Sequence, residues 1–191
     1  MVILIGAAGC TGKTLMAQTL LERYKIPYLS ADHLKMGLFR ANRNCGFFPE
    51  DSDERIEKKL WSVLRGIAHT CIENGQHLIM EGCYLFPGRL KALARAHREQ
   101  VIAVFMGFSE EYIRAHYDSG ILAHRSAIEK RGWPEERTIE GMIEAHQAMK
   151  RRCAEASVPY FEIAQDYGAE IEKVYRWIDG EVARIQKGIP D

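Results

Sequence analysis

The chain has 191 residues, of which 47% are hydrophobic and 27% are charged. Basic and acidic residues number 26 each, so the formal net charge is zero and no global field favours nucleic acid or an anionic membrane as a partner. No apolar stretch reaches the length of a membrane span, and the N-terminus lacks the basic region of an export signal. We therefore expect a single globular domain in the cytoplasm, with a sizeable core.

Short apolar runs alternate with longer amphipathic segments along the chain. Strands are predicted over residues 2–5, 26–32, 77–82, 101–108 and 158–163, and helices over residues 13–24, 54–73, 87–97, 134–155 and 171–185, with one more helix starting at 109. This alternation predicts an α/β fold, a parallel sheet with helices on both faces. Ligands of such sheets bind outside the carboxyl ends of the strands, where Asp32 and Glu81 fall.

The cysteines number five, and their spacings match neither a disulfide framework nor a zinc site. The simplest interpretation is reduced thiols in a cytosolic protein.

Residues 6–14 read GAAGCTGKT and follow the first apolar run. The segment resembles a Walker A P-loop, G-x-x-x-x-G-K-[ST], in which backbone N–H groups and a helix N-terminus surround phosphate oxygens. Lys13, expected to be exposed at the helix start, would reach the β- and γ-phosphates, and the Thr14 hydroxyl would bind Mg²⁺. The predicted nucleotide-binding residues are Gly9, Cys10, Thr11, Gly12, Lys13, Thr14 and Leu15.

The match to the motif departs at one position. Counting back from Gly12, the first glycine of the motif is replaced by Ala7, and Gly6 lies one residue too early. Either Ala7 takes that place, or the loop is one residue longer and begins at Gly6.

In the order of its predicted elements, nearly the whole chain resembles the P-loop small-molecule kinases. These form the nucleoside monophosphate kinase-like (adenylate kinase-like) group, which includes zeta-toxin-like and 2-phosphoglycerate-kinase-like proteins. The resemblance implies one P-loop kinase domain over residues 1–191, with a five-stranded parallel sheet and a small lid. It also implies transfer of the γ-phosphoryl group of ATP, with Mg²⁺, to a small-molecule acceptor.

Two carboxylates are candidates for the chemistry that the resemblance implies. In similar kinases an acid at the place of Asp32 contacts or activates the acceptor hydroxyl, although an aspartate there is also a common helix cap. Glu81 is the best candidate for the metal side, because no separate apolar run ending in aspartate is available. The alternative is that Glu81 makes structural bonds at a strand end.

The resemblance also assigns two covering segments. Residues 33–75 would cover the acceptor, with cations at Lys35, Arg40 and Arg43 for an anionic group and rings at Phe39, Phe47 and Phe48 for a pocket. Residues 118–133 correspond to a lid, in which Arg125 and Arg131 are the candidates that stabilise the transferred phosphoryl group. Each of these side chains could instead belong to an ordinary core or a solvated surface.

Two other functions remain open from the sequence. A polynucleotide 5′-kinase or RNA-processing enzyme would use the same loop, although the zero net charge argues against it. A nucleotide-binding module without transfer activity would need the loop but neither Asp32 nor a lid. The sequence does not identify the acceptor or the oligomeric state.

Overall fold

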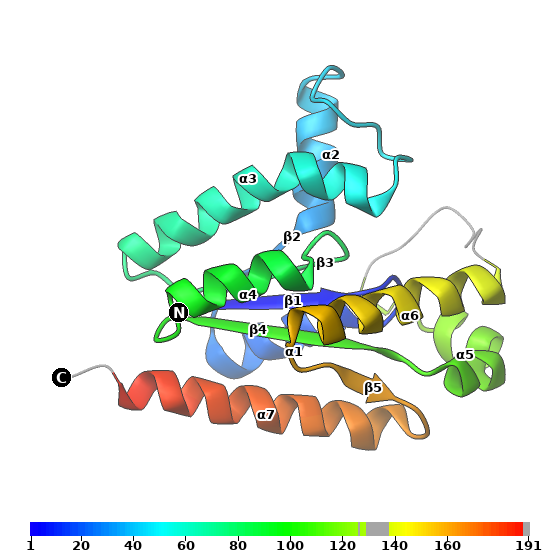
Figure 1. The fold of residues 1–191 in the computed structure, drawn as a ribbon. Helices are drawn as coiled ribbons and strands as arrows, with labels where there is room; N and C mark the ends of the chain where they lie inside the picture. Colours follow the sequence, from blue (N-terminus) through cyan, green and yellow to red (C-terminus); the bar gives the residue numbers. More distant parts are fainter. Residues whose placement is uncertain (126, 129–137, 189–191) are drawn as a thin grey trace.

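The computed structural model describes residues 1–125, 127–128 and 138–188. Its centre is a sheet of five strands in the order β2-β3-β1-β4-β5, with every neighbouring pair parallel (Figure 1). The strands are β1 (Val2–Ala7), β2 (Tyr28–Ser30), β3 (Leu78–Gly82), β4 (Val101–Phe108) and β5 (Phe161–Ile163).

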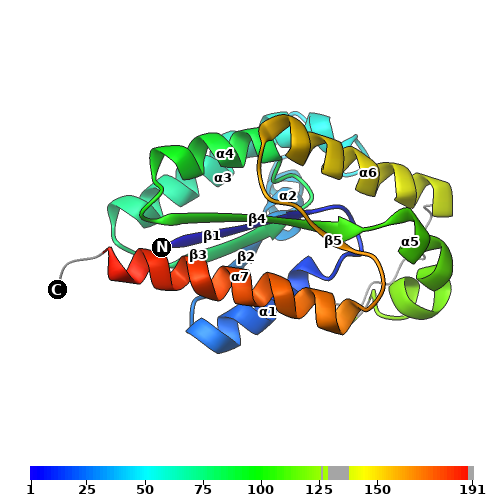
Figure 2. The ribbon, with the colours of Figure 1, turned by 60° about the horizontal axis from the view of Figure 1, so that its bottom comes forward.

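Helices cover both faces of this sheet. α1 and α7 lie on one face, and α3, α4 and α6 lie on the other, as the two ribbon views show (Figures 1 and 2). The helices are α1 (Lys13–Tyr24), α2 (Ala31–Ala41), α3 (Asp53–Glu73), α4 (Pro87–Ala96), α5 (Glu110–His116), the π-helix η1 (Tyr117–Leu122), α6 (Ile139–Ala156) and α7 (Tyr167–Lys187). The predicted fold, a five-stranded parallel sheet with helices on both faces, is confirmed.

Strand β1 supplies side chains to both hydrophobic cores because successive side chains of a strand point to opposite faces. Ile3 and Ile5 pack into the core beneath α1 and α7, whereas Val2 and Leu4 pack into the core beneath α3 and α4. All six residues of β1 are buried. The strand that leads into the glycine-rich loop is therefore fixed from both sides.

The element bounds differ from the sequence-based prediction at one place that matters for the site. The second strand stops at Ser30, and Asp32 lies in the first turn of α2 rather than at a strand end. Ser30 holds the N-cap position of α2, so the interpretation of Asp32 as the helix cap is wrong. Helix α6 is described from Ile139, and the start predicted at 134 lies outside the described residues.

Gly6 has a packing role within β1. A Cβ at this position would lie 2.5 Å from Cε1 of Phe105 and 2.6 Å from the carbonyl oxygen of Leu85. Strand β1 continues to Ala7, so the loop proper is Ala8–Gly12. Gly6 thus provides room for the neighbouring strand and the segment after β3, which accounts for a glycine one position before the motif.

We expect Gly6→Ala to destabilise the fold by about 1–3 kcal/mol, because a backbone oxygen and a fully buried ring must move. Gly37→Ala is the matched control, since a Cβ there meets nothing within 4 Å and alanine favours a helix. Urea unfolding of both variants measures the difference. Equal free energies of unfolding for Gly6→Ala and the unmodified chain would contradict the packing role.

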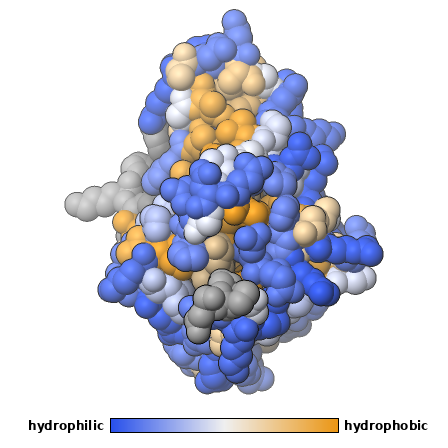
Figure 3. Space-filling view, turned by 90° about the vertical axis from the view of Figure 1, so that its left-hand side faces the viewer, coloured by the Kyte–Doolittle hydropathy of each residue, from blue (hydrophilic) through white to orange (hydrophobic). Residues whose placement is uncertain are grey.

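The end of the molecule at which the strands begin is shown in Figure 3. Apolar side chains gather in the upper half, at the height of α2 and α3, and around the middle of the view, whereas hydrophilic side chains dominate the lowest part. Within the described residues, no helix combines the length and the apolar character needed to cross a membrane. The five cysteines are all free thiols.

Candidate functional site

The loop Ala8–Gly12 joins β1 to α1 in a conformation that suits anion binding. Gly12 has a φ of 85°, in the left-handed region that glycine tolerates, and Cys10 has a φ of 63°. The buried Thr11 hydroxyl donates to the carbonyl oxygen of Ala8 over 2.8 Å and closes the loop. Helix α1 has neither a side-chain cap nor an acidic residue in its first turn, so its first N–H groups and its positive dipole end are available to an anion.

Tyr167, at the start of α7, supports the loop from the other end of the chain. Its hydroxyl donates to the carbonyl oxygen of Thr11 over 3.5 Å. A Cβ on Gly12 would lie 2.2 Å from the same hydroxyl oxygen. Glycine at position 12 is therefore required both by its backbone angle and by this close approach.

Lys13 is buried, with only 5% of its surface exposed, so the expectation of an exposed lysine is wrong. The reason is that Lys13 lies on the buried face of α1, together with Met16, Ala17 and Leu20. Its charge acts on Asp32 and on Cys83, the residue after β3. The ammonium group thus belongs to the interior of the site, among the groups that follow β2 and β3.

Thr14 and Glu81, the two predicted metal ligands, lie together. The Thr14 hydroxyl donates to Oε1 of Glu81 over 3.2 Å, and the parallel pairing of Ile5 with Glu81 brings their strands side by side. Glu81 is 1% exposed, and its Oε2 has no hydrogen-bond partner among the described residues. A buried carboxylate oxygen without a partner is costly, so this atom is one that a cation would satisfy.

Asp32 is surrounded by two donors, one of which the sequence reasoning missed. Its Oδ1 lies 3.1 Å from Nζ of Lys35, one turn along α2, and accepts from the Tyr84 hydroxyl over 3.2 Å. Lys35 in turn donates to the Tyr84 oxygen over 2.8 Å. Burial raises the pKa of the Asp32 carboxyl, but the charges of Lys35 and Lys13 and the two hydrogen bonds together hold this pKa below its usual value.

A cavity of about 360 Å³ opens beside the loop. Its walls come from the loop and the start of α1, from the end of β4, from α5 and η1, and from the start of α7. Arg125 lines this cavity, as do Gly120, Ile121, His124, Ala127 and Ile128 of the predicted lid segment. Ile121 is buried, so at least this part of residues 118–133 is anchored in the core. Arg131 lies outside the described residues.

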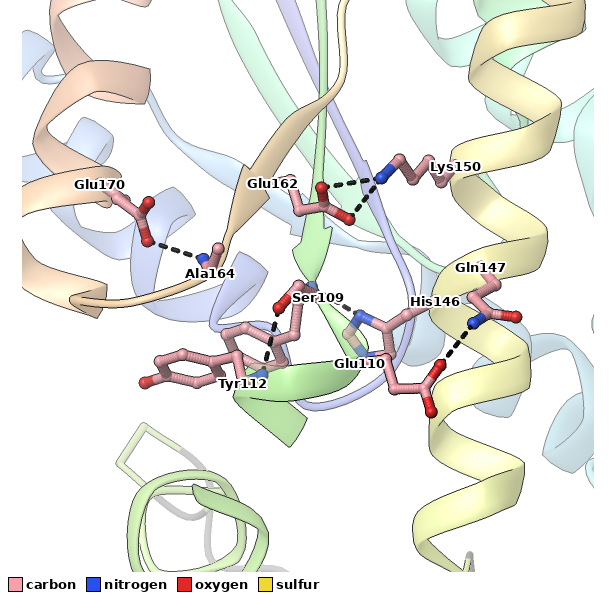
Figure 4. A network of polar contacts seen from close by, with 10 residues as sticks. Ser109, Glu110, Tyr112, His146, Gln147, Lys150, Glu162, Ala164 and Glu170 are labelled. Atoms are coloured by element: carbon pink, nitrogen blue, oxygen red, sulfur yellow. Dashed lines mark hydrogen bonds and ion pairs between the residues drawn. The ribbon is translucent and has the colours of Figure 1, made fainter. Parts of the chain in front are cut away.

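Polar contacts hold the carboxyl end of β4, which forms the cavity wall (Figure 4). Nδ1 of the buried His146 on α6 accepts from the backbone N–H of Phe108 over 2.8 Å. The Phe108 ring stacks on His146 and on Tyr112, with centroids 5.2 and 4.9 Å away.

Ser109 caps α5 by accepting from the N–H of Tyr112, which confirms the predicted helix start. Lys150 on α6 binds both oxygens of Glu162 in β5 at 2.7 Å.

The side chains predicted to bind or enclose an acceptor are arranged differently from the expectation. Lys35 points inward to Asp32 and Tyr84 instead of presenting a charge to an anion. Phe39 and Phe47 are buried in the core, whereas Phe48 is exposed. Arg43 lies over the Phe39 ring, 4.5 Å from its centroid.

The sheet order, the loop and the position of the strand ends define the class: the chain is a P-loop protein with the fold of the small-molecule kinases. It belongs to the AAA domain family, whose model matches residues 1–156. Among curated proteins, no sequence matches the chain.

Solved structures of kinases are similar to the chain over nearly its whole length. A gluconokinase from Sinorhizobium meliloti has a TM-score of 0.57 and 13% identity, with 97% of this chain and 94% of that chain covered. Shikimate kinases from Bacteroides thetaiotaomicron and Aquifex aeolicus each have a TM-score of 0.51. Their identities are 12% and 13%, and 94% and 96% of this chain and 98% and 99% of theirs are covered. At such identities the likeness shows the fold alone.

The structure therefore brings most of the predicted site residues into one region. Cys10, Gly12, Lys13, Thr14 and Leu15 border the cavity with Arg125, and Gly9 and Thr11 complete the loop. The aromatic walls at Phe108, Tyr112 and Tyr167, and the donor at Tyr84, were not predicted. The apolar run at 101–108 predicts only a buried strand, so its place in the site becomes visible from its position beside the loop.

Proposed function

We propose that this protein is an ATP-dependent kinase that transfers the γ-phosphoryl group to a hydroxyl of a small molecule. The observation that carries the proposal is the joint placement of a P-loop lysine, a hydroxyl–carboxylate pair at Thr14 and Glu81, and an ionised Asp32 within the field of Lys13. A nucleotide-binding module needs the first two. A carboxylate held ionised beside the phosphate-binding lysine serves transfer to a hydroxyl.

Each group has a separate part in the proposed reaction. The N–H groups of the loop and of the first turn of α1 bind the phosphates, and Lys13 stabilises the negative charge on the transferred group. Asp32 orients the acceptor hydroxyl and takes its proton. The cavity beside the loop takes the base and ribose of ATP, and Arg125 stands in its wall. We propose residues 118–133 as the lid, with Arg131 as a second candidate for the phosphoryl group.

The residues present fit a magnesium ion. Thr14 and Glu81 would hold it, because Mg²⁺ prefers oxygen ligands and is bound by one or two protein groups together with phosphate oxygens and water. The described residues contain no group of three or more His, Cys, Asp or Glu side chains that could form a complete protein site. When bound, the ion would offset the negative charge of the phosphates.

Glu81→Gln is expected to weaken the binding of ADP in the presence of Mg²⁺ by about tenfold, because one charged oxygen ligand becomes neutral. The free energy of unfolding should not fall, since the amide removes a buried charge and keeps an acceptor for Thr14. Calorimetric titration of ADP with and without Mg²⁺, beside a thermal melt, measures both effects. The same affinity in Mg²⁺ for both proteins would exclude Glu81 from the metal site.

The acceptor class is tested directly by incubating the protein with ATP, Mg²⁺ and a panel of hydroxyl compounds, and by following ADP formation and product mass. The panel should contain sugars, polyols, hydroxy acids and 5′-hydroxyl oligonucleotides. Transfer to a small hydroxyl compound is expected. Transfer to the oligonucleotides alone would replace the proposal with a polynucleotide kinase, and ATP binding without transfer to any compound in a metabolite extract would indicate a binding module.

A further inference from the structure

Asp32, Lys35 and Tyr84 form a cluster in which two donors hold one oxygen of the carboxylate. Lys35 comes from the turn of α2 after Asp32, and Tyr84 comes from the segment after β3, 52 residues away. Both donors contact the same atom, Oδ1 of Asp32. No hydrogen bond to Oδ2 from a described residue is found.

The exposure of the side chains separates their roles. The Asp32 side chain is 37% exposed, whereas the Lys35 side chain is 11% exposed and Tyr84 is buried. The positive charge is therefore behind the carboxylate, and the carboxylate is the group that solvent or a ligand meets first. The Lys35 ammonium also lies 5.2 Å from the centroid of the Tyr84 ring, so the ring and the hydroxyl both hold it.

We propose that Lys35 and Tyr84 are positioning residues, which fix Oδ1 of Asp32 so that Oδ2 is the atom that receives the proton of the acceptor hydroxyl. This inference rests on the proposed function. In the step, the O–H bond of the acceptor breaks and its proton passes to Oδ2. The acceptor oxygen forms a bond to the γ-phosphorus as the bond between that phosphorus and the β–γ bridging oxygen breaks, and ADP leaves with the electron pair. Asp32 then returns the proton to water.

The other titratable groups around Asp32 fit this arrangement. Burial raises the pKa of Tyr84, and burial also raises the pKa of Cys83 to about 11, so both stay neutral in ordinary buffers. Tyr84 is thus a hydrogen-bond donor rather than a competing base. Lys13 from α1 adds a second positive charge, and Asp53 at the start of α3 adds a negative one that acts on Tyr84 and Cys83.

The arrangement also limits the acceptor. Lys35 is already compensated by Asp32 and is turned away from solvent, so it offers no charge to an anionic group beside the attacking hydroxyl. Lys35 is therefore not expected to bind an anionic group of the acceptor.

The test follows the Asp32 carboxyl by carbon-detected NMR in the full chain with ADP and Mg²⁺, with the Asp32→Asn variant used for assignment. Lys35→Met should raise the measured pKa by about one unit or more, because a direct charge and a hydrogen bond are lost. Tyr84→Phe should raise it less, and Lys35→Arg should restore most of the shift. The control is Lys91→Met, which removes an exposed lysine on α4.

Kinetic measurements then test whether this geometry contributes to phosphoryl transfer. With an acceptor from the panel above, Lys35→Met should lower kcat roughly tenfold to a hundredfold, leave the KM for ATP nearly unchanged, and move the acid limb of the pH–rate profile upward. An unchanged carboxyl pKa in Lys35→Met overturns the positioning role even if the protein is a kinase. If Lys35→Met raises the pKa of the Asp32 carboxyl but the unmodified protein transfers no phosphoryl group, the contact between Lys35 and Asp32 is supported and the kinase proposal is overturned.

Discussion

Lys13→Met is expected to lower phosphoryl transfer by at least 10²- to 10³-fold while the fold remains intact. The methionine keeps most of the buried aliphatic stem of Lys13, so packing changes little. What is lost is the one loop side chain that brings a positive charge to the phosphates, and losing a single charge-stabilising donor at a reacting centre has effects of this size. ADP formation under saturating ATP and a thermal melt measure the two properties.

Lys173→Met is the control for Lys13→Met, because it removes an exposed lysine on α7, far along the chain from the loop. Its turnover should match that of the unmodified chain. If Lys13→Met keeps full turnover, the P-loop assignment is wrong. If it fails to fold, Lys13→Arg, which keeps the charge but changes the shape of the donor, separates the electrostatic from the structural contribution.

Asp32→Asn is expected to lower transfer by about 10²- to 10⁴-fold, with nucleotide affinity changed by less than about threefold. The amide retains an oxygen that accepts from Lys35 and Tyr84, but it has no basic oxygen for the acceptor proton. Single-turnover rates and ADP titration by calorimetry separate the two quantities. Equal losses in rate and in affinity would point to a structural or metal-binding role for Asp32.

The same substitution has a pH-dependent effect on stability. Because the pKa of folded Asp32 is below its unfolded value, its ion pair with Lys35 stabilises the fold above the unfolded pKa and is lost as the pH falls through the folded pKa. The difference in melting temperature between the unmodified chain and Asp32→Asn should therefore narrow in acid. The difference at neutral pH should be smaller than for a fully buried pair, because the Asp32 side chain is 37% exposed.

The sequence predicts the framework of the site better than its contacts. The continuous apolar run at 101–108 and the serine after it are local signals, and both are confirmed to the residue. The glycine-rich loop is also predicted from a local signal, the order of its adjacent residues. The sequence predicts Asp32 at a strand end because apolar residues continue through Leu29, whereas in the structure Ser30 is the N-cap of a helix that begins at Ala31.

The missing parts of the site depend on tertiary contacts. The three-residue spacing of Asp32 and Lys35 predicts an ion pair only on a helix, and the sequence pattern does not predict a helix over residues 31–41. Tyr84 reaches Asp32 only because β2 and β3 are neighbours in the sheet, an order that the sequence does not contain. The burial of Lys13 likewise results from elements far from it in the chain.

The contact between Tyr167 and the loop has a consequence for biosynthesis. During synthesis the loop leaves the ribosome well before the hydroxyl that supports Thr11 and covers Gly12, which lies 156 residues later. The contact that supports the loop therefore forms only after the start of α7 has been synthesised and has packed against the sheet. A growing chain would carry this loop without the Tyr167 contact while the residues between them are synthesised, and we expect nucleotide binding to follow the packing of α7.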